Sequence, residues 1–346
     1  MTIILFIIVL LVCVLVHEWG HYITAKKSGM LVEEFGFGIP PRLWSWKNGE
    51  TRYSINALPI GGFVKIAGEN GATEGVPLDR QFETKPWYLK SLVLLAGVIM
   101  NIILALVLFA AAYLIGLPGV VDGGTPTVIS VSEGSPVAAS GILVGDTITR
   151  VAVGPTPVAL LTTEAIHEAI VGSTKDVTIS YFHAGDPQTV TLTPTKDRTI
   201  GVSIEPIGIV KESFTDAFVK AAQQVVTLTR NILGALSTLV GRIASGHPST
   251  SGLIGPVGLA KEIGSAATFG FAYLLAFIAT ISINLAVLNA MPFPALDGGR
   301  LIIVWGEALT RRKFSPTTVG VIHGIGFLIL IGLMIALTVG DVKRAL

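Results

Sequence analysis

Four long apolar stretches determine what this 346-residue chain can fold into. A helix needs about 20 apolar residues to cross the roughly 30 Å hydrocarbon core of a bilayer. Stretches of that length run over Thr2–Ala25, Ser91–Ile115, Phe269–Met291 and Val319–Gly340. In the whole chain 51% of residues are hydrophobic and only 14% are charged, whereas soluble domains contain about a quarter charged residues. The sequence therefore predicts a polytopic α-helical membrane protein with about four transmembrane helices.

The basic residues indicate how these spans are oriented, because lysine and arginine are enriched in cytoplasmic loops. They flank or fill the loops between spans one and two and between spans three and four: Lys26, Lys27, Lys85, Lys90, Arg300, Arg311, Arg312 and Lys313. The segment 116–131 has none, and Lys343 and Arg344 favour the opposite orientation only weakly. We expect these two basic loops in the cytoplasm, and both termini and the long central loop outside. The net charge of +1 gives no basis for binding nucleic acid.

The first apolar stretch ends in the sequence His17-Glu18-Trp19-Gly20-His21. On a helix this HExxH spacing puts both imidazoles on one face, where they can share a zinc ion, with Glu18 placed as general base for a water molecule. Ionisable residues are costly inside a membrane and are by default candidates for a functional site. The motif therefore indicates hydrolytic chemistry within the bilayer or at its edge.

A catalytic zinc site needs a third protein ligand and one open position. The single cysteine, Cys13, excludes an internal disulfide and a CxxC zinc site. Asp297 follows the third apolar stretch, and Pro292 and Pro294 before it cannot continue a helix. Broken backbone at membrane depth is tolerated where it is buried in protein or lines a cavity. Asp297 is therefore the expected third ligand, although a His₂Asp set does not by itself decide between zinc, cobalt and iron.

Two further features near this segment have simpler expected roles. Gly298 and Gly299 are expected to allow a tight turn after Asp297. His323 lies in the fourth apolar stretch among glycines, and we expect it to pack against another helix rather than bind metal.

The composition of residues 125–206 is that of a soluble domain. Its expected elements are strands at Val128–Val131, Thr147–Ala152, Val177–Phe182 and Thr189–Thr193, and helices at Pro136–Ser140 and Glu164–Val171. The run Ser135–Asp146 resembles the helix-and-turn signature of PDZ domains in bacterial proteases. This resemblance implies one extracytoplasmic PDZ-like α/β domain, which either binds a peptide as an added strand or excludes bulky substrates as a steric gate.

Beyond this domain, Val225 to Ile243 keeps an apolar residue at helical spacing. The pattern predicts an amphipathic helix that lies on the outer membrane surface or packs on the soluble domain.

The HEWGH motif, the Asn289-x-x-Pro-x-Pro-x-Leu-Asp297-Gly pattern and the PDZ-like loop together resemble the site-2 protease family over nearly the whole chain, and within it the RseP-like bacterial subgroup. The resemblance implies a Zn²⁺ enzyme with His17, His21 and Asp297 as ligands and Glu18 as catalytic base. It also implies that Asn289 holds the substrate backbone or oxyanion near the metal. The implied substrates are single-span membrane proteins, such as anti-sigma factors already cut by an upstream site-1 protease, and remnant signal peptides.

The segments Gly36–Pro41, Thr51–Ile55 and Pro59–Ile66 read as short strands with turns. They resemble the membrane-associated β-hairpin of the family, which implies that Gly61, Gly62 and Phe63 bind substrate by edge pairing. The run Gly97–Asn101 in the second span matches a further family pattern, and close helix packing explains its glycine equally well.

The expected organisation is an N-terminal membrane half (1–115), a PDZ-like domain (122–207), an amphipathic helix with linker (208–262) and a C-terminal membrane half (263–346). The expected location is the bacterial inner membrane, with the active site toward the cytoplasm. Three alternatives are weaker: a membrane-anchored zinc protease acting on cytosolic chains, a non-catalytic PDZ-bearing scaffold, and a transporter with a broken helix. None of the three needs both the intact HEWGH and the Pro-x-Pro segment.

Overall fold

The computed structural model describes residues 2–69, 71–132, 134–158, 162–171, 175–183, 185–195, 199–245 and 254–345. The chain divides into two compact units, one made of residues 1–114 and 213–346, the other of residues 115–212.

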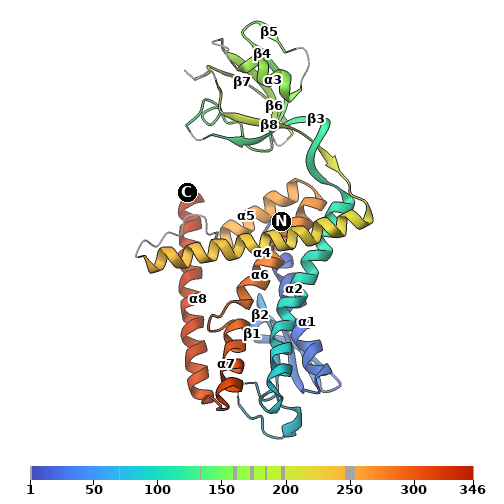
Figure 1. Cartoon of the computed structure of the whole chain (residues 1–346), viewed down its shortest axis with the longest axis vertical. Helices are drawn as coiled ribbons and strands as arrows, with labels where there is room; N and C mark the ends of the chain where they lie inside the picture. Colours follow the sequence, from blue (N-terminus) through green and yellow to red (C-terminus); the bar gives the residue numbers. More distant parts are fainter. Residues whose placement is uncertain are drawn as a thin grey trace. The chain divides into compact units, whose positions relative to one another are not determined.

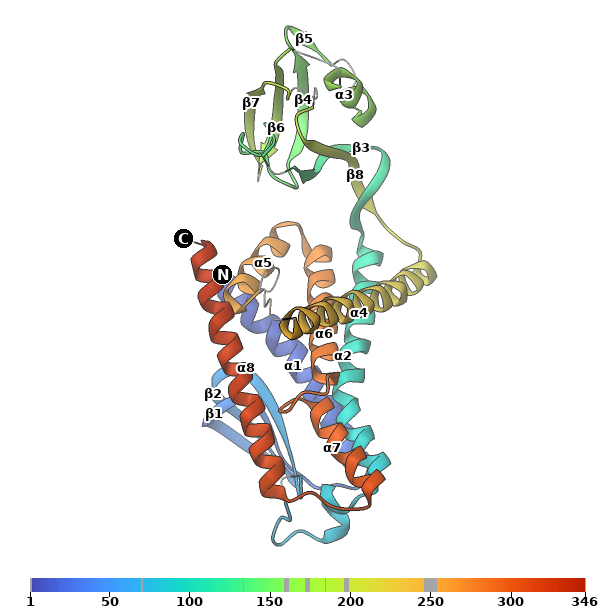
Figure 2. The ribbon, with the colours of Figure 1, turned by 60° about the vertical axis from the view of Figure 1, so that its left-hand side comes forward.

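Four helices of the first unit are long and apolar enough to cross a membrane: α1 (Thr2–Lys27), α2 (Trp87–Ile115), α6 (Phe271–Ala290) and α8 (Pro316–Ala345). They coincide with the four predicted spans, so the prediction of a polytopic α-helical membrane protein is confirmed. In Figures 1 and 2 the C-terminal part of α1 and the lower part of α2 lie at the same end of this unit as the short helix α7 (Asp297–Thr310).

The amphipathic helix is α4 (Phe214–Ala244), and Figure 1 shows it lying across α6 and α2. Its apolar stripe packs on these two helices, since Ala221 and Val225 share a buried cluster with Phe109 of α2 and Ile283 of α6. The sequence suggested the membrane surface or the soluble domain as the partner of this stripe. The contacts of this stripe lie within the first unit, and a position on the membrane surface stays a prediction. The helix α5 (Pro256–Thr268) packs on α1, α6 and α8.

The predicted hairpin is formed by two long antiparallel strands, β1 (Val32–Asn48) and β2 (Thr51–Ile66). Residues 34–37 of β1 have partners in both 52–55 and 62–65, so this part of β1 lies between two parts of β2. Among the described pairings, residues 62–65 have a strand partner on one side only. These residues therefore form a sheet edge in a strand that also contacts α1. Two 3₁₀ turns follow the hairpin, at Leu78–Arg80 and Phe82–Thr84.

The second unit is built on a six-stranded sheet in the order β7-β6-β4-β3-β8, with β5 paired to β4. The strands and the one helix are β3 (Leu117–Val131), β4 (Thr147–Val153), β5 (Thr156–Pro157), α3 (Thr163–Ile170), β6 (Val177–His183), β7 (Asp186–Leu192) and β8 (Val202–Val210). Its core includes Val137, Ile148, Ile166 and Ile179, all fully buried. An antiparallel sheet with one covering helix fits the predicted α/β class.

Three local expectations were wrong or incomplete. Residues 136–140 form turns rather than a helix, because the left-handed Gly141 (φ +86°) ends a stretch too short to repay helix nucleation. The strand β8 was not predicted. Gly298 and Gly299 do not make a turn but lie in the first turn of α7, where a side chain would collide with the backbone of Ala290, Met291 and Phe293.

Candidate metal centre

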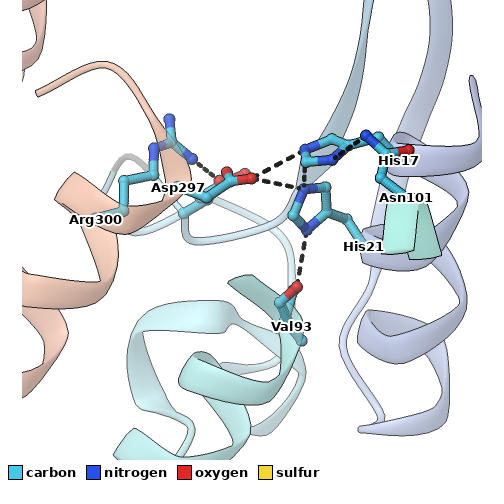
Figure 3. Close-up of polar contacts among 7 residues, drawn as sticks. His17, His21, Val93, Asn101, Asp297 and Arg300 are labelled. Carbon is cyan, nitrogen blue, oxygen red and sulfur yellow. Dashed lines mark hydrogen bonds and ion pairs between the residues drawn. The ribbon is translucent and has the colours of Figure 1, made fainter. Parts of the chain in front are cut away.

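Three side chains from two elements converge on one point. His17 and His21 lie one turn apart on α1, and Asp297 is the first residue of α7. Oδ2 of Asp297 lies 2.9 Å from Nε2 of His17 and 3.2 Å from Nε2 of His21, and the two imidazole nitrogens are 3.1 Å apart. Figure 3 shows both rings and the carboxylate turned toward one another. Among the described residues this is the one group of three or more such side chains that can hold a metal ion.

These distances fit a tetrahedral zinc site. Nitrogen and oxygen ligands at about 2.0–2.1 Å from zinc in a tetrahedron lie about 3.3 Å from each other. The three ligand atoms are separated by 2.9–3.2 Å, close to that edge length. Both histidines are buried, and the side chain of Asp297 is 20% exposed. The donor set of two imidazoles and one carboxylate, with room for a fourth position, therefore fits zinc.

The hydrogen bond on the far side of His21 fixes its tautomer. Nδ1 of His21 lies 2.8 Å from the carbonyl oxygen of Val93, which can only accept. The proton is therefore on Nδ1, and Nε2 is left with a free lone pair facing Asp297. Metal-binding histidines almost always donate their other N–H in this way.

Asn101 performs the same task for His17. Its amide nitrogen lies 3.5 Å from Nδ1 of His17, and its Oδ1 is buried without a hydrogen-bond partner among the described residues. Amide nitrogen and oxygen exchange places on a 180° rotation of the side chain. In the rotated orientation Oδ1 accepts from the Nδ1–H of His17, which gives this oxygen a partner and leaves Nε2 of His17 with a free lone pair for a metal.

We expect Asn101→Leu to weaken zinc binding about 10–100-fold, the usual cost of removing the partner that orients a metal-bound histidine. The measurement is the zinc retained by the purified protein at increasing chelator concentration. Asn284→Leu, the same change in another membrane helix, is the control, since the side chain of Asn284 bonds to the Thr280 carbonyl of its own helix and not to the candidate ligands among the described residues. Unchanged zinc retention by Asn101→Leu would contradict the assignment.

Gly97 allows α2 to lie directly against the two histidines. A Cβ atom at this position would lie 2.5 Å from Nε2 of His21 and 2.7 Å from Nε2 of His17. Gly20, the residue before His21 on α1, packs equally closely, because a Cβ atom there would lie 2.4 Å from the carbonyl oxygen of Ala96. The two explanations of the Gly97–Asn101 pattern are therefore compatible, because the close helix packing takes place at the candidate ligands themselves.

Glu18 and the hairpin edge border a cavity of about 370 Å³ that reaches two of the three candidate ligands. Glu18, His21 and Asp297 line it together with residues 62–66 of β2. Gly62 is so near Glu18 that a Cβ atom there would lie 3.2 Å from Cγ of Glu18. Phe63 lines the same cavity, while Gly61 adopts a left-handed conformation (φ +85°) beside it.

Two charged residues of this cavity were not predicted. Arg300, one turn after Asp297 on α7, forms an ion pair with Glu69, just after β2. The pair connects the helix that carries Asp297 to the segment that follows β2. The spacing of three residues from Asp297 was a signal for Arg300, but Glu69 has no comparable pattern.

Asn289 is the second-last residue of α6 and is partly buried. Among the residues that the structure describes, no hydrogen bond joins it to His17, His21 or Asp297. Its predicted role in substrate binding stays a prediction.

Known proteins are similar to this chain over nearly its whole length. A family model described as peptidase family M50 matches residues 5–333. A Clostridium acetobutylicum protein provisionally named as a zinc metalloprotease is 34% identical over 336 residues, covering 96% of this chain and 94% of the relative. A Clostridium perfringens protein with the same kind of name is 32% identical, covering 95% of each chain. The zinc metalloprotease RasP of Oceanobacillus iheyensis is 26% identical, covering 99% of each.

Proposed function

The chain belongs to peptidase family M50, the site-2 protease family of zinc metalloendopeptidases, and we propose that it cuts single-span membrane proteins within their transmembrane segments. The observation that carries this proposal is the position of the metal ligands. His17 and His21 lie within a 26-residue helix that is long and apolar enough to span a membrane. A peptidase that holds its metal on such a helix meets its substrate at membrane depth.

His17, His21 and Asp297 are the residues that would hold the zinc ion. When bound, zinc acts as a Lewis acid that activates water and polarises the peptide carbonyl. Glu18 takes the proton from the attacking water and delivers it to the departing amine, since it lines the same cavity as His21 and Asp297. Val93 and Asn101 hold the imidazoles in the orientation that zinc binding requires.

The sheet edge at residues 62–65 supports a mode of substrate binding. A peptide bond inside a helix is shielded by its own hydrogen bonds, so the substrate must be extended before it is cut. An extended segment that pairs with this edge runs along the cavity that Glu18 and Asp297 line. Gly62 and Phe63 would then contact the substrate backbone, and Asn289 would hold it from α6. Exposed Ile39, Leu43 and Trp44 on β1 favour placing the hairpin in the membrane.

The proposal also covers the second unit and the orientation of the chain in the membrane. Residues 115–212 form a PDZ-like domain that we assign to the extracytoplasmic side of a bacterial inner membrane, with the metal centre toward the cytoplasm, near Lys26 and Lys27 at the end of α1. A cavity of about 450 Å³ borders α3 and residues 199–204, where a peptide strand can be added. The alternative role of this domain is that of a steric gate, which admits only substrates already trimmed by an upstream protease.

The test uses the full chain in detergent with a model single-span substrate. We expect fragments whose ends, read by mass spectrometry, fall inside the substrate's transmembrane segment. Removal of metal by a chelator should abolish the cutting, and added zinc should restore it, because no other cluster among the described residues can supply the metal. Cuts only in the substrate's soluble tails would contradict an intramembrane activity. Cutting that survives metal removal would contradict the metal-dependent mechanism.

A further inference from the structure

The loop before Asp297 contains a residue, Ala295, in a backbone conformation that alanine does not favour. Between α6 and α7, Ala295 has φ +77°, in the left-handed region that residues with a side chain seldom adopt. Ala295 precedes Asp297 by two residues, so its conformation sets the direction in which the chain enters α7. Such a conformation persists where the surrounding structure holds it in place.

Residues of α8 hold Ala295 in this conformation. The backbone N–H of Ala295 donates a hydrogen bond of 2.8 Å to Nδ1 of His323. One turn along α8, Gly326 packs so tightly on Pro294 that a Cβ atom would lie 2.5 Å from the Pro294 carbonyl oxygen. His323 and Gly326 therefore hold two consecutive residues of the loop from the same face of the helix.

This contact differs from ordinary packing of a lipid-facing helix. Most of α8 near this point is exposed, including Ile322 and Ile325. A backbone N–H can only donate, so Nδ1 of His323 must accept and carries no proton. Nε2 is buried without a partner in the part of the chain that the structure describes, so the hydrogen bond to Ala295 is the one that the ring makes there.

We propose that His323 is a positioning residue for the metal centre, which holds Asp297 in place through the Ala295 backbone. This inference rests on the proposed function, because it requires that Asp297 is a zinc ligand. The sequence favoured a simple packing role for His323. A packing role needs only the ring's shape, whereas positioning needs a hydrogen-bond acceptor at the place of Nδ1. The two roles therefore predict different substitutions.

The experiment compares His323→Phe with His323→Asn in the full chain in detergent. Phe keeps an aromatic ring of similar size but has no acceptor, and Asn places its side-chain oxygen near the position of Nδ1. We expect His323→Phe to lose zinc at about 10–100-fold lower chelator concentration than wild type, with kcat lowered and KM little changed. His323→Asn should recover most of both losses. Ile325→Ala, an exposed change on the same helix, is the control and should behave as wild type.

Two results would overturn the inference: wild-type zinc retention in His323→Phe, or equal impairment of the Phe and Asn variants, which would indicate packing alone. If His323→Phe is not recovered as folded protein, His323→Gln replaces it, because its oxygen lies one bond beyond the required position. The proposed function fails separately, if wild type holds no zinc or if Asp297→Ala holds it as well as wild type.

Discussion

Replacing Glu18 by glutamine is expected to abolish cleavage while leaving zinc bound. Glutamine has the same shape and reaches the same cavity, but it cannot take a proton from water. Removing a general base typically costs about 10²–10⁴-fold in rate. Zinc should stay because the three converging ligand atoms belong to His17, His21 and Asp297, and Glu18 is not among them. The measurement is the cleavage rate of a single-span substrate together with the zinc content of each preparation.

The matched control is Glu262→Gln, the same change at an exposed position on α5. It should cleave at the wild-type rate. If Glu18→Gln loses both activity and zinc, then Glu18 supports the metal site and its role as base is wrong. If Glu18→Gln cleaves normally, the activity comes from another site or from a contaminant. Loss of cleavage with full zinc content is the outcome that the geometry predicts.

The parts of this structure that the sequence predicted are those with a local or compositional signal. The four spans follow from length and hydrophobicity, which the bilayer imposes directly. His17 and His21 share a helix face because of their spacing alone. Asp297 was identifiable as their partner because Pro292 and Pro294 interrupt the helix at membrane depth. Non-helical backbone and a carboxylate at that depth indicate a buried site or a polar cavity.

The parts that the sequence did not predict depend on how distant elements pack. His21 is oriented by the backbone carbonyl of Val93. Because every residue has such a carbonyl, the amino-acid sequence does not show which one forms this hydrogen bond. Alanine at position 295 gives no sign of a left-handed conformation, so its support by His323 was not foreseen. The ion pair of Arg300 and Glu69 joins residues that only the fold brings together.

The two glycines after Asp297 were predicted to be structurally important, but for the wrong reason. Glycine permits a tight turn, but it also permits close approach of two backbones. Gly298 and Gly299 lie in a regular helix, and the lack of a side chain lets α7 begin directly against residues 290–293. This close approach brings the start of α7 near the histidines of α1.

Replacing Asp297 by alanine is expected to remove both zinc and activity. The simpler explanation of this aspartate is a carboxylate that caps the start of α7. The structure argues against it, because the N-cap residue is Leu296 and no side chain caps this helix, while the carboxylate of Asp297 faces the two imidazoles. Loss of one of three ligands should weaken zinc binding by more than the roughly 10–100-fold cost of losing a supporting residue.

Zinc retention and thermal unfolding, measured on the same preparations, distinguish the two roles. A ligand role predicts that Asp297→Ala loses zinc at chelator concentrations that leave wild type loaded, while the metal-free forms of both unfold at similar temperatures. A role limited to the charge at the helix start predicts the reverse: zinc is kept, and the helix loses about 0.3–1 kcal/mol. Asp186→Ala, the same change at an exposed position of the second unit, controls for the substitution itself. Because Asp297 is the one candidate ligand of the three that does not lie on α1, its loss should leave two histidines whose affinity is too low to keep the metal during purification.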